Sequence, residues 1–149
     1  MKSIFDNTLR KEVITRINSL TKNSTALWGE MTVEQMVKHC ILCEKYYHGQ
    51  FKVKRSPIGQ KIGAETINEI LKDEDTKIGL NAKTSHEFIV LEKDLDLIEE
   101  KKNWIELLNL YEFYNLTRIT HWFFGDMTKE QLGQFIYKHC DHHLRQFGA

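Results

Sequence analysis

Hydrophobic residues recur at helical spacing along most of this chain, and strand-like alternation is scarce. The first predicted helix covers residues 8–22, with an apolar face formed by Leu9, Val13, Ile17 and Leu20. Polar residues of the same segment, Arg10 among them, are predicted to face solvent.

Two later helices are marked by capping boxes, in which a threonine and a glutamine three residues further on exchange hydrogen bonds. Thr32 and Gln35 open a helix that is predicted to run to residue 47. Thr128 and Gln131 open the last helix, which is predicted to end at residue 148.

The segments between these helices are less regular. Ser56 and Pro57 predict the start of a shorter helical piece that reaches residue 72. The polar stretch 73–87 is predicted to be a loop that wraps the body or borders a pocket, and 88–91 to be briefly extended. A long helix is predicted over 92–114, with 99–102 facing water and an apolar face made by Leu91, Leu95, Ile98, Ile105, Leu108 and Tyr111.

Four principal helices, one shorter helical piece and no convincing strand predict an all-α fold, a four-helix bundle with an extra helical piece. A length of 149 residues suits a single domain over residues 1–149.

The apolar stripe of the last predicted helix continues into histidines, because Leu132, Phe135 and Ile136 are followed on the same face by His139 and His143. These two histidines lie four residues apart, so their rings are one turn apart on one side of the helix. His39 similarly shares an apolar stripe on the second predicted helix with Met36, Cys40, Cys43 and Tyr47.

Three inward imidazoles from two helices predict a metal centre at His39, His139 and His143, since three neutral histidines with an open fourth position are typical of catalytic zinc. Nickel, iron(II) and copper also accept imidazole ligands. Such an ion lowers the pKa of bound water to roughly 7 or converts a bound thiol into a thiolate. The alternative is that each histidine is a hydrogen-bonded residue of the core.

Other residues are candidates for supporting roles. Asp141, Arg145 and Gln146 are predicted to orient ligands or substrate. His142 faces elsewhere and is predicted to lie at the surface or to support a ligand, and His121 to close the pocket.

Three cysteines, Cys40, Cys43 and Cys140, are an odd number that argues against a disulfide framework. Cys40-x-x-Cys43 fits half of a zinc site or a redox pair, or two small buried hydrophobic residues, and no second such pair completes a zinc ribbon.

A short internal similarity connects the two capped helices. Residues 29–36 resemble residues 125–132, and each run is followed by Lys-His-Cys, at 38–40 and at 138–140. The repeat is either structural or a chance likeness of two good helix starts, and in both cases each helix presents a histidine to the interior.

Composition narrows the function classes. Lys+Arg and Asp+Glu both number 21, so the net charge is zero and nucleic-acid binding is disfavoured. Apolar runs are too short to span a bilayer and the N-terminus lacks a signal-peptide pattern, which predicts a cytoplasmic protein. Motifs of di-iron bundles, zincins and phosphate-binding loops do not occur.

Three stretches carry a resemblance to a known family: residues 28–39, which begin Trp-Gly-Glu-Met-Thr; Thr84-Ser85; and residues 124–148, which contain His-x-x-x-His-x-x-Gln and end in Phe-Gly. They resemble the DinB/YfiT-like superfamily, and within it a branch of unknown function. His121-Trp122 and Ser85-His86 stand where that branch has His-Pro and Ser-Pro, and these changes are expected to reshape the pocket rim.

The resemblance implies an up-down-down-up four-helix bundle, a metal-binding triad at His39, His139 and His143, and frequent homodimers. Some relatives are metal-dependent transferases that use low-molecular-weight thiols, but the branch itself implies no activity. The sequence thus predicts a metal-dependent enzyme acting on a small molecule, of thiol-transferase or hydrolase type. The alternative is a non-enzymatic stress-response or binding module with a structural metal.

Overall fold

The computed structural model describes all 149 residues of the chain. It contains five α-helices, two short 3-10 helices and two strands. In chain order these are α1 (Asn7–Ser19), α2 (Val33–Tyr47), α3 (Pro57–Ile70), η1 (His86–Phe88), α4 (Leu97–Asn109), η2 (Leu110–Phe113), β1 (Arg118–His121), β2 (Gly125–Thr128) and α5 (Lys129–Gln146).

Both predicted capping boxes are present. The Thr32 and Thr128 side chains each accept a hydrogen bond from the backbone N–H three residues on, and the glutamine side chains there accept one in return. Ser56 likewise caps α3, with Pro57 as its first residue. These local signals therefore fix where α2, α3 and α5 begin.

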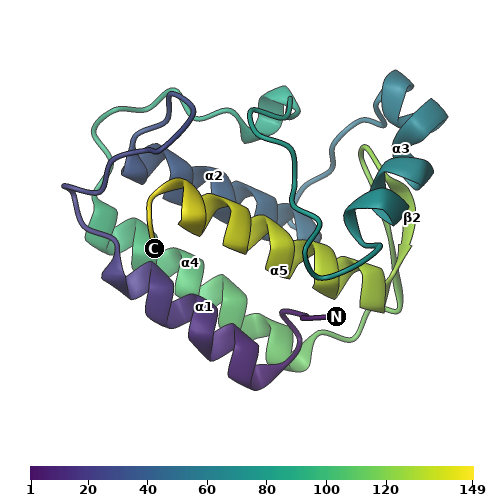
Figure 1. Cartoon of the computed structure of the whole chain (residues 1–149), viewed down its shortest axis with the longest axis horizontal. Coiled ribbons are helices and arrows are strands. Elements are labelled where there is room, and N and C mark those ends of the chain that lie inside the picture. The colour runs from purple at the N-terminus through teal and green to yellow at the C-terminus, as the bar shows by residue number, and fades with distance from the viewer.

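The helices α1, α2, α4 and α5 lie alongside one another, whereas α3 and the two strands stand together at one end (Figure 1). Their shared interior is one hydrophobic core to which all four long helices contribute. Its largest fully buried side chains include Trp104, Met36, Ile17 and Ile136.

The prediction of an all-α four-helix bundle with one shorter helical piece is wrong, because the five helices, of which α3 is the predicted shorter piece, are accompanied by an antiparallel hairpin. In the hairpin, β1 pairs with β2, with Ile119 opposite Met127. The strands have only four residues each, so their alternation is too short to stand out in the sequence.

Two glycines of α3 allow it to pack closely against the turn of this hairpin. A Cβ on Gly59 would lie 2.3 Å from the carbonyl oxygen of Phe123, and one on Gly63 2.1 Å from the same atom. Only glycine therefore allows α3 to approach the hairpin turn so closely.

The long helix predicted over 92–114 is shorter than expected. Asp96 accepts hydrogen bonds from two backbone N–H groups, which starts α4 there, and the helix ends at Asn109. The buried face is also rotated, since Leu91 and Ile98 are exposed while Glu100 is buried in an ion pair with Lys38.

Arg10 was predicted to face solvent but is buried. Its guanidinium donates hydrogen bonds to the carbonyl oxygens of Ile4 and Phe5 and to the Asn7 side chain. These acceptors compensate the cost of burying the charge.

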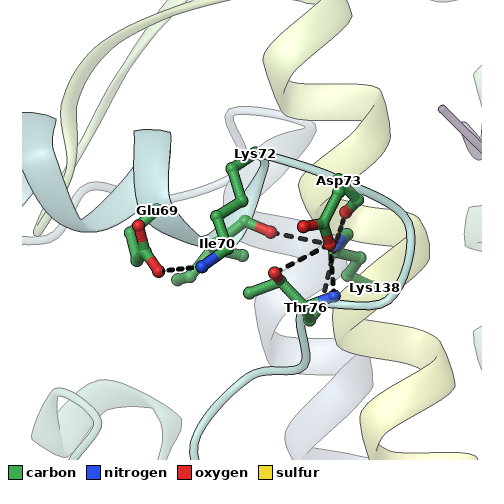
Figure 2. A network of polar contacts seen from close by, with 6 residues as sticks. All are labelled: Glu69, Ile70, Lys72, Asp73, Thr76 and Lys138. Carbon is green, nitrogen blue, oxygen red and sulfur yellow. Dashed lines mark hydrogen bonds and ion pairs between the residues drawn. The ribbon is translucent and has the colours of Figure 1, made fainter.

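The loop predicted over 73–87 is confirmed as far as residue 85, where η1 follows, and it is held to the body by α5. The Lys138 ammonium donates to the carbonyl oxygens of Ile70, Asp73 and Thr76, at 2.9, 2.6 and 2.7 Å (Figure 2). One side chain therefore both caps the end of α3 and fixes the loop. No helix combines the length and apolar character that crossing a membrane requires.

Candidate metal centre

The structure brings the three predicted histidines together between α2 and α5. The ring centroid of His39 lies 5.5 Å from that of His139 and 4.9 Å from that of His143, and the latter two are 4.7 Å apart. Three imidazoles around one tetrahedral ion, with metal–nitrogen bonds of ~2 Å, have centroids roughly 5 Å apart. The ring spacing therefore suits a shared ion.

Hydrogen bonds fix the orientation and tautomer of two of these rings. The Nδ1 atom of His39 lies 2.8 Å from the carbonyl oxygen of Phe88, and that of His143 lies 2.9 Å from Oε1 of Gln146. Both oxygens only accept, so each Nδ1 carries the hydrogen and each Nε2 keeps its lone pair. Ligand histidines in metal sites have this arrangement.

Gln146 is itself held in place. Its Nε2 donates to the carbonyl oxygen of Trp28 at 2.8 Å, which leaves Oε1 for His143. Gly29 follows with a φ of +79°, and a Cβ there would lie 2.8 Å from the Gln146 amide nitrogen. The predicted supporting role of Gln146 thus has a direct contact, and the Trp-Gly motif makes room for it.

His139 differs from its two neighbours. Its Nδ1 is buried and has no hydrogen-bond partner, although the residue as a whole is partly exposed. Buried nitrogens rarely lack a partner, so an orphaned one at this place requires an explanation. His139 is also the least constrained of the three rings.

Burial keeps all three imidazoles neutral. Loss of solvent lowers the pKa of His39, and burial with the neighbouring imidazoles lowers that of His139 well below its usual value. Burial lowers the pKa of His143 to about 3. Each ring therefore offers a free lone pair at pH 7, as metal ligation requires.

Donor atoms approach most closely in two sets of three. The first set is His39, Cys43 and His139, and the second is Cys40, His139 and His143; within each, the donor atoms all lie within 4.8 Å of one another. His139 is common to both sets. Binding of one ion by all three histidines therefore requires at least one ring to turn.

Cys43 is a potential donor, a role that agrees with one of its three predicted interpretations: half of a zinc site, a redox pair or a small buried residue. Its Sγ lies 3.7 Å from Nε2 of His39, one helical turn earlier on α2. The signal was present in the sequence, because the two residues are four apart on a face already known to carry a histidine.

His121 is buried but belongs to a different environment. Its Nδ1 accepts hydrogen bonds from the backbone N–H groups of Phe123 and Phe124, at 3.1 and 3.2 Å. Its ring stacks on that of Phe124, and burial lowers its pKa to about 3. His121 thus supports the hairpin turn and belongs to neither donor set.

His142 was predicted to lie at the surface or to support a ligand, and the structure excludes the first of these. It is 6% exposed, and its ring lies 5.0 Å from that of His143 and 5.6 Å from that of Trp28. Its Nδ1, like that of His139, is buried without a partner. His142 therefore packs directly behind the candidate ligand His143.

Asp141 and Arg145 are ion-pair partners on the outer side of α5. Asp141 pairs with Arg145 at 2.8 Å and with Arg16 of α1 at 2.9 Å. Both line a polar cavity of about 310 Å³ that none of the three candidate histidine ligands borders. No contact of Asp141 or Arg145 with the three candidate ligands supports the prediction that they orient ligands or substrate.

One acidic side chain is buried near the cysteines. Glu44 is 1% exposed, and its carboxyl receives hydrogen bonds from the hydroxyl of Tyr111 and, at 3.7 Å, from the thiol of Cys140. Burial raises the pKa of Glu44 to about 7. Both carboxyl oxygens are thus engaged away from the histidines.

A family profile described as "Protein of unknown function (DUF1569)" matches residues 4–149. The chain belongs to this family. No curated protein matches the chain. No solved structure matches it either.

Proposed function

We propose that the protein binds one divalent transition-metal ion through His39, His139 and His143 and uses it to act on a small molecule. The observation that carries this proposal is the orphaned, buried Nδ1 of His139 beside two imidazoles whose tautomers are already set for ligation. The resemblance to DinB/YfiT-like proteins, which implies ligands at the same positions, supports it.

The bound ion would supply Lewis acidity for activating a water or a thiol, which suits a hydrolase or a thiol transferase. The chain contributes orientation: Phe88 and Gln146 hold two rings, and the partly exposed His139 marks the side from which a small molecule enters. A low-molecular-weight thiol is the substrate class we expect first, since its sulfur binds such ions well.

Metal content tests the binding step. The variant His143→Ala should lose the stoichiometric metal that the tag-free wild-type protein retains. His121→Asn is the matched control, because it removes a buried imidazole that lies at the hairpin turn and belongs to neither donor set. Equal metal in wild type and His143→Ala would overturn the site.

Turnover tests the enzymatic step. Wild-type protein loaded with zinc, nickel or iron should convert an electrophile in the presence of a small thiol, or hydrolyse an ester, and chelated protein should not. Failure of every thiol and ester probe with fully loaded protein would contradict the enzymatic assignment but leave the metal site intact.

A second candidate function is a binding or stress-response module in which the metal is structural. The engagement of Glu44 favours it, since both oxygens of this buried carboxyl already accept hydrogen bonds and are not free to act as a base. Chelation separates the two: a large fall in melting temperature without any turnover supports the structural role.

Location and assembly are expectations that accompany the proposal. The three cysteines are free and buried, which suits a reducing compartment such as the cytoplasm. A homodimer is expected from the resemblance alone.

A further inference from the structure

The thiol of Cys43 lies at the edge of the proposed centre and has no role in it so far. Cys43 is on α2, one turn after His39, and is 4% exposed. Its Sγ, Nε2 of His39 and a ring nitrogen of His139 form the first of the two close donor sets. Two of its three members are ligands of the proposed centre.

The separation between Cys43 and His39 matches two ligands of one ion. A tetrahedral zinc ion, with bonds of ~2.3 Å to sulfur and ~2.0 Å to nitrogen, holds these atoms roughly 3.6 Å apart. The observed distance from Sγ to Nε2 is 3.7 Å. The same distance allows the thiol to donate a hydrogen bond to Nε2. The two atoms can therefore share either the thiol proton or a metal ion without a change in their separation.

The tautomer of His39 leaves Nε2 available as a ligand atom. Because Nδ1 of His39 donates to the Phe88 carbonyl, the lone pair of the ring is on Nε2, the atom that faces Cys43. The backbone of η1 (His86–Phe88) thereby sets the nitrogen that the sulfur approaches.

Cys40 is the rival thiol, but it cannot share an ion with His39 in this way. It follows His39 directly, so its side chain points ~100° away around the helix. Its thiol instead donates to Met36 Sδ at 3.9 Å, and it is fully buried. A set that keeps His39 therefore takes Cys43.

We infer that Cys43 supplies a sulfur ligand to the ion at His39 and His139, which makes the centre a mixed nitrogen and sulfur site that suits zinc. This inference rests on the proposed function. The metal–sulfur bond forms as the thiol releases its proton to solvent, and the ion is neither oxidised nor reduced. Thiolate favours zinc and copper(I) over the other ions that imidazole accepts. A thiol substrate would compete with Cys43 for the ion.

Cobalt(II) in place of zinc tests the inference, because a thiolate ligand adds an intense near-ultraviolet charge-transfer band to the visible d–d bands. The wild type, Cys43→Ser, Cys40→Ser and Cys140→Ser proteins are titrated with cobalt(II). Cys140→Ser is the matched control, since it changes an equally buried thiol that contacts Glu44 and belongs to neither donor set.

The band should appear in the wild type, Cys40→Ser and Cys140→Ser and be lost in Cys43→Ser, which should still show d–d bands. Cobalt bound by the wild type without a charge-transfer band would overturn the sulfur ligand and leave the proposed function standing. Loss of the charge-transfer band in Cys40→Ser alone would show that Cys40, and not Cys43, supplies the sulfur, which would overturn the inference. No cobalt binding at all would instead overturn the proposed function.

X-ray absorption on the zinc-loaded wild type covers the case in which Cys43→Ser does not fold. A sulfur scatterer at ~2.3 Å from zinc is expected, next to nitrogen scatterers at ~2.0 Å. A first shell of nitrogen and oxygen alone would contradict the inference.

Discussion

The two faces of α5 treat their polar side chains in opposite ways. On the outer face, Lys138 donates to three carbonyl oxygens and Asp141 pairs with two arginines. On the inner face, His139 buries an Nδ1 atom that has no partner.

The difference separates polar groups whose partners the chain supplies from a buried nitrogen that the chain leaves without a partner. Every partner that the outer charges need is supplied by the chain, so the outer face requires no ligand to explain it. Burial lowers the pKa of His139 and keeps its ring uncharged, and its buried Nδ1 has no partner, an arrangement that costs stability unless something else binds the ring. The outer cavity of about 310 Å³ is lined mostly by polar residues, yet the inner cluster is the better functional candidate.

The largest expected effect is on the inner face, where His139 belongs to both close donor sets. His139→Ala should abolish tight metal binding, whichever cysteine takes part. Isothermal titration with zinc measures the affinity, and Lys138→Met on the adjacent outer position is the control that should bind normally. Wild-type affinity in His139→Ala would remove the basis for distinguishing the two faces.

A smaller effect is expected from Gln146, which orients a ligand without binding the ion. Gln146→Ala should weaken metal binding by about 10–100-fold, the usual cost of losing a residue that holds a ligand histidine. Gln146→Glu keeps an acceptor for Nδ1 of His143 but loses the donor to the Trp28 carbonyl, so it should restore only part of the affinity. An unchanged affinity in Gln146→Ala would show that His143 needs no such support.

His121 has hydrogen-bond partners and should act only through stability. Burial lowers its pKa to about 3, below the unfolded value near 6.5, so the unfolded chain binds the proton first as pH falls. The contribution of neutral His121 to the free energy of unfolding is therefore complete above about pH 6.5. It falls by about 2 kcal/mol as the pH is lowered to about 5.

His121→Asn keeps an acceptor for the turn and removes the titration. Urea unfolding of both proteins at a series of pH values measures the difference, and the variant should lose less stability on acidification. Parallel pH curves for the two proteins would contradict the assignment of His121 as a buried neutral residue.

The smallest expected effect is on the outer face. Lys138→Met should cost about 1 kcal/mol of unfolding free energy, since the partly exposed ammonium can be replaced by water at its three carbonyl partners. The loop 73–87 should exchange its amide hydrogens faster, and metal affinity should stay the same. A marked loss of metal affinity in Lys138→Met would show that the outer face also affects the metal site.

Local signals explain which parts of this fold were predictable. The capping boxes at Thr32 and Thr128 and the Ser56-Pro57 start act through neighbouring residues, so the sequence alone locates them. The hairpin depends on long-range packing of α3 glycines against its turn, which no local pattern encodes. Its strands are also too short to alternate visibly.

The site divides in the same way. Helical spacing was enough to predict that His139 and His143 share one face of α5 and that His39 lies on the inward face of α2. The contacts that complete the site come from outside these helices: the Phe88 carbonyl at η1 and the Trp28 carbonyl before α2. Such backbone acceptors have no sequence signature, and neither does the ion pairing that removes Asp141 and Arg145 from the site.

The most direct test of the central claim is anomalous diffraction at the zinc edge from crystals of the tag-free protein. The account predicts one strong peak per chain, about 2.0–2.3 Å from donor atoms of the His39, His139 and His143 cluster. A zinc peak only in the outer cavity, among side chains such as Glu74 and Asp141, would contradict it, and so would the absence of bound zinc.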